Sequence, residues 1–382
     1  MSTRRSLIAM SAFSMAGNTP LVVQPMVVGA MVDLLGLTER EAGTVASVEL
    51  VGLTLGILVM MGLMNSTQRG TLALFAVATI VAANLVTCFV HGFFWLLFTR
   101  FLSGIGAAAA FCVYLNMASS DSHPEHVFAI VNAVSIAYSG ALTLIASYLL
   151  HAGGLPGMLL VLSLITLAAL LTLPWVLRLG PPLPGRSRTL GLGALPSHVL
   201  PLLAMMLLLY TGHGAIWAYQ ERIGVATGLD EHTVGKWLGL SMLICGVLGS
   251  LLARLLSLSL GRIWPQTISL GLSCLAALFL VFGSAPATFA ASCGLIAFSW
   301  FYGLPYQMGL LAARDPKGRA ALAGVMMSTG GMALGPAAAA LLLVQRTHWR
   351  IGVFSGICYL AALAIAVPAA RTLPRLNKME LA

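Results

Sequence analysis

Apolar runs of about 20 residues follow one another along nearly the whole chain, separated by short polar breaks. A run of that length is what an α-helix needs to cross a hydrocarbon core of about 30 Å. Charged residues make up only 8% of the sequence, whereas a soluble domain has roughly 25%. The sequence therefore predicts an all-α membrane protein. Alternating ten-residue patterns, which would indicate a membrane β-barrel, are absent from it.

Twelve transmembrane helices are expected from these runs, because twelve segments are long and apolar enough to span a bilayer. Their ranges are 7–32, 43–64, 71–90, 93–117, 127–150, 156–177, 199–221, 234–256, 264–283, 286–311, 321–344 and 351–370. The even number places both ends of the chain on the same side of the membrane.

Basic residues are distributed unequally between the breaks. If both ends are cytoplasmic, fourteen of the 20 Lys and Arg residues fall on the cytoplasmic side and five on the opposite side, with Arg100 inside a span. This excess predicts cytoplasmic termini in the cell membrane, the inner membrane in a prokaryote. The basic residues occur one to three at a time, so the formal charge of +9 does not indicate a nucleic-acid partner.

Two segments repeat at an offset of 192 residues, from Gly36 to Gly228. Residues 36–43 and 228–235 share Gly, Leu, Glu and Gly at matching places, and the offset is about half of the 382-residue chain. A stretch rich in Pro, Gly and Arg lies between the halves. We therefore expect a six-helix bundle at 1–178, a flexible cytoplasmic linker at 179–198 and a second six-helix bundle at 199–382.

The fourth predicted span carries a recognisable motif. Residues 96–108 read Leu-Leu-Phe-Thr-Arg-Phe-Leu-Ser-Gly-Ile-Gly-Ala-Ala. This segment resembles the Leu-x-x-x-Arg-x-x-Gln-Gly-x-Gly-Ala-Ala motif of the major facilitator superfamily, with Ser103 in place of Gln. Two departures accompany the resemblance: the loop at 62–70 lacks the family's Asp, and the antiporter Gly-Pro motif is absent from the fifth span.

The resemblance implies a monomeric secondary transporter with two pseudo-symmetric bundles, which moves a small organic solute by alternating access and is driven by protons. Export is favoured slightly, and nutrient or organic-acid import is the alternative. A sensor or lipid flippase with the same fold is the rival from another class. The sequence shows no P-loop and no catalytic triad order. We expect neither an enzyme nor a bound cofactor or metal, and membrane lipid as the surrounding partner.

Glu49 and Arg100 fall at a similar depth in the second and fourth spans, about 9 and 10 Å from the outer side at 1.5 Å per residue. Charges at that depth are costly unless they are paired or face a wet cavity. Three interpretations remain open. The residues form a static ion pair, or Glu49 carries the coupling proton, or Glu49 reaches an outer partner such as Arg222. The second interpretation requires that Glu49→Gln abolish pH-driven flux without changing protein abundance.

The seventh span ends in an unusual concentration of polar and aromatic residues. Glu221 and Arg222 are either interfacial charges or part of an outer gate. His213 lies deeper, as a neutral core histidine or a residue facing the substrate. Rings and amides can bind an uncharged solute by stacking and hydrogen bonding. The predicted substrate-binding residues are Asn18, Gln24, Tyr210, His213, Trp217, Gln220, Trp300, Tyr302 and Gln307.

Overall fold

The structure is a computed structural model, and every regular element in its described residues is helical. The described residues are 4–63, 69–90, 92–119, 121, 124–177, 195–256, 259, 261, 263–283, 285–315, 319–343 and 348–371. The helices of the first part are α1 (Arg4–Asp33), α2 (Glu39–Leu63), α3 (Arg69–Thr87), α4 (Phe93–Ser119), α5 (Pro124–Ala168), η1 (Ala169–Thr172) and α6 (Leu173–Leu177). Those of the second part are η2 (Ser197–Val199), α7 (Leu200–Ala226), α8 (Glu231–Leu240), the π-helical η3 (Ser241–Gly246), α9 (Val247–Leu256), α10 (Ile263–Phe282), α11 (Pro286–Arg314), α12 (Arg319–Leu342) and α13 (Trp349–Arg371).

Eleven helical segments of the described chain are long and apolar enough to cross a membrane, and one of them accounts for two predicted spans. Residues 126–177 form a continuous segment of 52 residues, about 78 Å at 1.5 Å per residue and far longer than a bilayer is thick. Gly154 interrupts this segment with non-helical angles (φ 60°, ψ −166°), and Pro156 follows it. The chain reverses there, so the segment crosses the membrane twice and the structure agrees with the predicted twelve crossings.

The two repeated segments begin α2 and α8 in the same way. Gly36 and Gly228 both have positive φ, 68° and 88°, which a residue without a Cβ adopts at little cost. The next helix is then capped in each case. Thr38 and Glu41 exchange hydrogen bonds in a capping box before α2, and Asp230 accepts from the Thr233 N–H at the start of α8. The sequence repeat therefore encodes a turn followed by a helix start.

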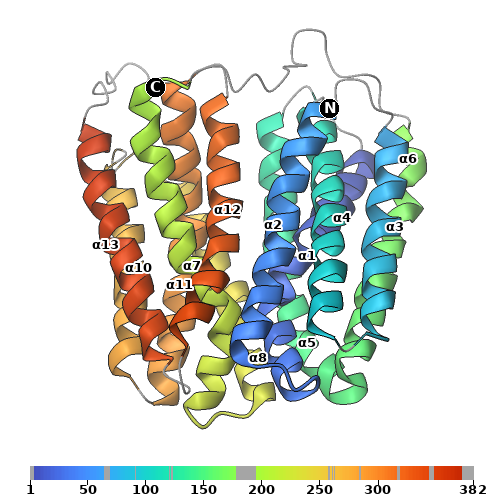
Figure 1. Cartoon of the computed structure of the whole chain (residues 1–382). Helices are drawn as coiled ribbons and strands as arrows, with labels where there is room; N and C mark the ends of the chain where they lie inside the picture. Colours follow the sequence, from blue (N-terminus) through green and yellow to red (C-terminus); the bar gives the residue numbers. More distant parts are fainter. Residues whose placement is uncertain are drawn as a thin grey trace.

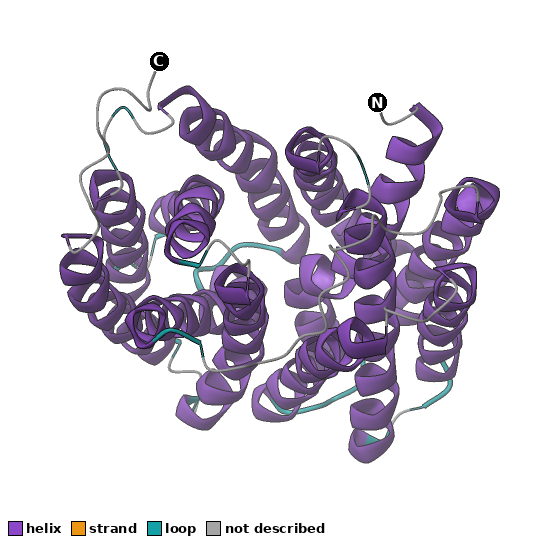
Figure 2. Cartoon of the chain, turned by 90° about the horizontal axis from the view of Figure 1, so that it is seen from above, coloured by secondary structure: helices purple, strands orange, loops and turns teal. Residues whose placement is uncertain are grey.

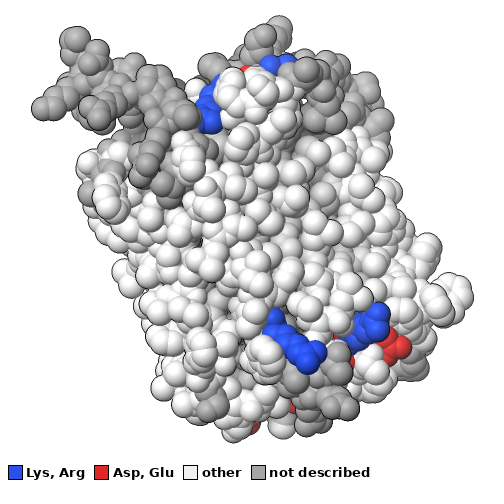
Figure 3. Space-filling model, turned by 60° about the vertical axis from the view of Figure 1, so that its left-hand side comes forward, with Lys and Arg blue, Asp and Glu red and all other residues white. Residues whose placement is uncertain are grey.

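All the long helices run between the two ends of the molecule, and both chain ends lie at the same end (Figure 1). We call this end the terminal face, and the opposite end, which carries residues 34–38 and 227–230, the far face. Figure 3 shows one side of the molecule, where the described charged side chains lie near the two ends and none lies in the band between them. Large apolar side chains such as Phe94 and Phe282 are 81% and 82% exposed. Such exposure is expected where side chains face lipid.

Seen along the helices, the ribbons fall into two groups (Figure 2). In one group α4 packs against α1, α2 and α3, and in the other α7 packs against α12 and α13. Contacts between the groups are made chiefly by the pairs α2 with α12, α5 with α8 and α1 with α7. Residues 178–194 lie outside the described residues, so the boundaries of the linker and of the bundles it joins stay a prediction.

Within the first group, α2 and α4 approach closely because glycines lie where they meet. A Cβ at Gly104 would collide with the backbone carbonyl of Glu49, and one at Gly52 with that of Phe101. Small residues at such crossings let helix backbones pack by van der Waals contact in a membrane, where no hydrophobic force drives association. Gly104 belongs to the motif in the fourth span, so this part of the motif has a packing role.

We expect Gly104→Ala to destabilise the protein by about 1–3 kcal/mol, because the added methyl group must push α2 away from α4. The thermal unfolding midpoint of purified protein in detergent measures the effect. Gly309→Ala is the matched control, since a Cβ there meets nothing within 4 Å. Equal midpoints for the two variants would contradict the assigned packing role.

Candidate functional site

A cavity of about 260 Å³ lies between the two groups of helices. Its lining comes from α1, α2, α4 and α5 on one side, and from α7, η3, α11 and α12 on the other. Asp, Glu, Lys, Arg and His are absent from this lining. The cavity therefore offers hydrogen bonds and apolar contacts without a formal charge.

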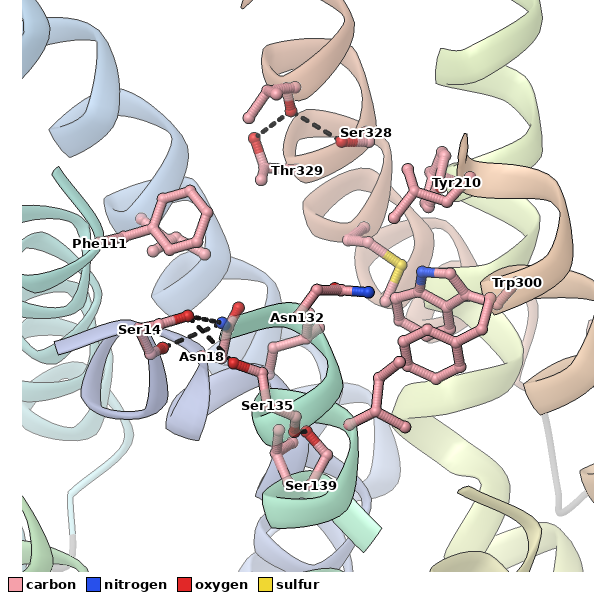
Figure 4. Close-up of a pocket in the computed structure, with 18 of the residues that line it drawn as sticks. Ser14, Asn18, Phe111, Asn132, Ser135, Ser139, Tyr210, Trp300, Ser328 and Thr329 are labelled. Atoms are coloured by element: carbon pink, nitrogen blue, oxygen red, sulfur yellow. Dashed lines mark hydrogen bonds between the residues drawn. The ribbon is translucent and has the colours of Figure 1, made fainter. Parts of the chain in front are cut away.

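The wall formed by α1 and α5 is polar (Figure 4). The Ser14 and Ser135 hydroxyls lie 3.1 Å apart, which joins the two helices. The Asn18 amide donates to the Ser14 carbonyl oxygen at 2.9 Å. Along α5, residues at helical spacing form a stripe that faces the cavity: Asn132, Ser135, Ser139 and Thr143.

The wall formed by α7 and α11 is aromatic. Trp300 lies at its centre, with the Tyr210 ring 6.1 Å away and the Trp217 ring 6.3 Å away, both nearly perpendicular to it. The Phe301 ring stacks on Trp300 at 5.9 Å and 11°. Such a wall presents flat apolar surfaces to a ligand.

Four of the predicted substrate-binding residues line this cavity: Asn18, Tyr210, Trp217 and Trp300. Gln307 lies behind the wall, where it accepts a hydrogen bond from the Tyr210 hydroxyl at 3.2 Å. Their binding role stays a prediction. The geometry shows that these residues from α1, α7 and α11 converge, although α1 is nearly 200 residues from α7 in the chain.

The other four predicted residues point elsewhere. Gln24 donates to the Ala46 carbonyl on α2 at 3.3 Å, and Gln220 donates to the Cys293 sulfur at 3.1 Å. His213 lies among aromatic rings, with Nδ1 3.0 Å from the Leu209 carbonyl oxygen. Tyr302 packs in a separate cluster with Tyr306. None of the four is among the residues that line the described cavity.

Several lining residues were not predicted, notably Ser135, Ser139 and Thr143 of the α5 stripe, with Ser14 on α1 and Ser328 and Thr329 on α12. The stripe could have been recognised from the sequence by its spacing. Asn132, Ser135, Ser139 and Thr143 recur every three or four residues in an otherwise apolar helix, the spacing of one helical face. Single hydroxyl residues attract little attention in a sequence, whereas their periodicity indicates a face that meets something polar.

Glu49 and Arg100 do meet, inside the first group of helices. Arg100 Nη1 lies 3.4 Å from Glu49 Oε1, and Arg100 Nη2 donates to Asn84 and Thr87 at 2.9 Å each. Both charged side chains are buried, and neither lines the cavity. The arrangement links α2, α3 and α4, and excludes the alternative pairing of Glu49 with Arg222.

Glu221 and Arg222 are buried inside the protein near the far end of α7, which continues to Ala226, and only 2% and 7% of their surfaces are exposed. Arg222 donates to both oxygens of Asp33 at the end of α1, one bond measuring 2.8 Å. It also donates to Glu221 at 2.5 and 2.8 Å. Gly29 makes room for this cluster, since a Cβ there would collide with the Glu221 carboxylate. Asp33 was not predicted as a site residue.

Several hydrogen bonds that join the two groups of described helices lie toward the far face. The Tyr219 hydroxyl donates to the Glu39 carbonyl at 2.8 Å, and His348 Nε2 lies 3.2 Å from the Glu39 carboxylate. Deeper in, the Ser47 hydroxyl donates to the Ala333 carbonyl at 2.5 Å. These contacts hold the two groups of helices together near the Arg222 cluster.

Trp217 makes the deepest of these contacts on α1. Its indole N–H donates to the Leu21 carbonyl at 2.7 Å. In a regular helix that carbonyl would accept from the residue four positions later, which is Pro25 and has no N–H. Trp217 therefore satisfies a backbone acceptor that a proline leaves free.

The comparisons with known proteins agree with this architecture. The family model described as Major Facilitator Superfamily matches residues 6–331. Among solved structures, the crystal structure of a mutant of the nucleoside transporter NupG is similar, with a TM-score of 0.72 and 10% sequence identity, over 94% of this chain and 99% of that chain. At that identity the likeness concerns the fold. The search of curated proteins found no match.

The family model covers most of the chain, and the cavity lies between two helical groups as a transported solute requires. The chain belongs to the major facilitator superfamily, and it is a multi-pass membrane protein that transports a small molecule rather than an enzyme.

Proposed function

We propose that this protein moves an uncharged, amphipathic organic solute across the cell membrane by alternating access, driven by the proton gradient. The observation that carries the proposal is the cavity between the two helical groups, whose lining has polar and aromatic side chains and no charged ones. A charged solute without a counter-charge in such a site would lose its hydration without compensation. Export is favoured slightly over import, and the sign of the flux decides between them.

Two bundles, at 1–178 and 199–382, are the moving parts in this proposal, with residues 179–198 as their linker. The grouping of the helices supports it, because the contacts between the groups are concentrated in three helix pairs. We place the terminal face in the cytoplasm. Arg4, Arg5, Arg69, Arg254, Arg314 and Arg319 belong to helix ends at that face, against Arg40, Arg222, Lys236 and Arg350 at the far face.

Flux in proteoliposomes tests the transport proposal. Purified protein is reconstituted under an imposed pH gradient and challenged with neutral sugars, nucleosides and amphipathic compounds, while an internal dye reports pH. The name of the structural neighbour is the reason for including nucleosides. We expect a solute to trigger proton movement, and the direction of that movement distinguishes import from export. If the folded protein shows no proton movement with any compound of the panel, the proposal is contradicted.

We propose that Asp33, Glu221 and Arg222 form the gate of the far face. Asp33 and Arg222 lie on α1 and α7, and therefore in different bundles, so an opening of this face must separate them. Arg222 keeps Glu221 as its neighbour on the same helix when that happens. Separating Asp33 from Arg222 is costly because the guanidinium is buried and loses a charged partner.

Asp33→Asn should loosen the closed far face, since Arg222 loses its charged partner on the other bundle. A reporter cysteine, Ser47→Cys, sits in the contact between α2 and α12. We expect its alkylation by a membrane-impermeant maleimide to rise about tenfold in the Asp33→Asn background, as site-resolved mass spectrometry would measure. Tenfold corresponds to a shift of about 1.4 kcal/mol in the opening equilibrium.

Asp230→Asn serves as the control for this experiment. It removes a carboxylate at the same face, where Asp230 caps α8 through Thr233 and is fully exposed. Asn is an equally good N-cap residue, so helix stability is kept. Equal labelling rates in the Asp33→Asn and Asp230→Asn proteins would show that Asp33 does not hold the gate shut.

The same cluster supports a place for the coupling proton. Arg222 contacts two carboxylates, Asp33 and Glu221, and Glu231 lies beside Asp33. The three carboxylates share one guanidinium, so the cluster has two more negative groups than positive ones, and a bound proton reduces this excess. In the proposed opening Asp33 leaves the cluster while Arg222 stays with Glu221, so the number of carboxylates around the bound proton changes and proton binding is linked to the gate. Glu49 has one guanidinium as its own partner and no such excess.

The charged groups that face this cluster come from five places around it. They are Asp33 on α1, Glu39 and Arg40 on α2, His151 on α5, Glu231 on α8 and His348 before α13. A substitution that removes the titrating carboxylate should abolish the pH response, whereas changes to its neighbours should shift the pH at which the response occurs.

Glu221→Gln should abolish solute uptake driven by a pH gradient while solute exchange at equal pH continues, because exchange needs no net proton movement. Glu49→Gln is the matched comparison, a buried Glu to Gln change in the other cluster. We expect it to lower the thermal unfolding midpoint and to leave pH-driven uptake in the folded fraction. The opposite pattern, with coupling lost only in Glu49→Gln, would move the proton site to Glu49 and Arg100.

A further inference from the structure

The cavity has many hydrogen-bond acceptors, because several of its hydroxyl protons are already donated within the protein. The Ser139 hydroxyl donates to the Ser135 carbonyl and the Thr143 hydroxyl to the Ser139 carbonyl, both at 2.8 Å. The Ser328 hydroxyl donates to the Val325 carbonyl at 2.8 Å. A hydroxyl has one proton and two lone pairs, so each oxygen can still accept but no longer donate.

The other polar groups of the wall follow the same pattern. The Tyr210 hydroxyl donates to Gln307, and the Trp217 indole donates to the Leu21 carbonyl. The Asn18 amide nitrogen donates to Ser14, which leaves its carbonyl oxygen free to accept. A ligand that fills this cavity must therefore bring its own donors if the oxygens are to be satisfied.

Several of the described lining groups keep an unused donor, among them the Tyr114 hydroxyl on α4, and two of these groups come from opposite walls. Within the part of the chain that the structure describes, the Asn132 amide and the Trp300 indole N–H have no hydrogen-bond partner, and both residues line the cavity. In Figure 4 the Asn132 side chain extends from α5 with its nitrogen directed toward the aromatic wall. A ligand between them can contact both helical groups at once.

The aromatic wall adds a requirement of shape. Trp300 is only partly buried, and Tyr210 and Trp217 stand nearly perpendicular to it. A flat ligand face can lie against such rings and bury apolar area, while its edge remains available for hydrogen bonds. The polar wall lies across the cavity, on α1 and α5.

The absence of charged side chains from the lining disfavours charged ligands, both anions and organic cations. An anion would find uncharged donors such as the Asn132 amide, the Trp300 N–H and the Tyr114 hydroxyl, with no Lys or Arg in the lining. An organic cation would find acceptors and aromatic faces but no carboxylate to compensate its lost hydration. A neutral ligand meets neither difficulty.

We infer that the cavity binds a neutral ring compound bearing several hydroxyl or N–H donors, with its flat face on Trp300 and its donors directed at the Asn132, Ser139 and Thr143 stripe. This inference rests on the proposed transport function and specifies its substrate class. The ligand bridges the two bundles, because the ring face belongs to α11 and the hydrogen-bonding edge to α5.

Matched ligands test this substrate class. Phenyl β-D-glucoside and uridine have the required ring and hydroxyl groups. Their counterparts, the tetra-O-methyl glucoside and 2′,3′-dideoxyuridine, keep the ring but lose donors, and tetraphenylphosphonium and benzoate supply the charged classes. Affinity is measured from the thermal shift of the purified full-length protein, and solute exchange from proteoliposomes. We expect at least one hydroxylated compound to bind, and its donor-poor counterpart to bind at least tenfold more weakly.

Variants of the two free groups sharpen the test. Asn132→Leu keeps the side-chain size and removes the amide, so we expect about tenfold weaker binding of the hydroxylated ligand. Trp300→Phe keeps a ring and removes the N–H, with an expected loss of about fivefold. Trp264→Phe is the control, because Trp264 is 65% exposed on α10 and does not line the cavity. It should bind like the unmodified protein.

Several outcomes would overturn the inference: tighter binding of a charged compound, equal binding of the donor-poor counterparts, or no binding of any hydroxylated compound. The same experiments distinguish a failure of this substrate class from a failure of the transport proposal. Exchange of tetraphenylphosphonium alone would leave transport standing and refute the neutral, donor-rich class. Binding of hydroxylated compounds without any exchange would support the site and refute transport.

Discussion

The low polarity of the bilayer interior governs how this protein uses its few charged residues. A charge held at membrane depth has to be paired, and the two buried arginines of the described helices, Arg100 and Arg222, are both paired. They differ in what the pair joins. Arg100 connects helices within one group, whereas Arg222 connects α1 to α7 across the two groups. One pair therefore holds together helices of a single group, and the other lies where the proposed gate would open.

The same constraint explains why the cavity is free of charge. Its walls are supplied by opposite helical groups with different chemistry, oxygen acceptors on α1 and α5 and aromatic rings on α7 and α11. Pseudo-symmetric halves have thus diverged in their side chains while keeping equivalent helix starts at Gly36 and Gly228. In the proposed function, the two related halves are the moving parts, and the difference between their side chains sets the selectivity.

The fold could be predicted from the sequence because the length of an apolar run depends on bilayer thickness, which is the same for every span. The cavity could be predicted only in part. Helices here are apolar on the lipid side as well as the core side, so periodicity does not show which face points inward. Tyr210, Trp217, Trp300 and Asn18 stood out by residue type and do line the cavity. His213 and Tyr302 stood out equally and pack among other rings.

Asp33 shows a different limit. It lies at the last residue of α1, where a carboxylate is ordinary, and its partner is 189 residues away in the chain. Only the three-dimensional arrangement brings the two together. For Glu221 and Arg222 the predicted helix was too short. The predicted span ended at 221, whereas α7 continues for five more residues to Ala226, and both side chains are buried.

The proline at position 25 has an effect that extends beyond α1. It leaves the Leu21 carbonyl without its helical donor, and the indole of Trp217 supplies one from the other group of helices. Separation of the two groups at this level would strip that oxygen of its donor in a medium that offers none. Water or the ligand must then take the place of the indole. The two groups can therefore separate at this level only where water or the ligand reaches the Leu21 carbonyl.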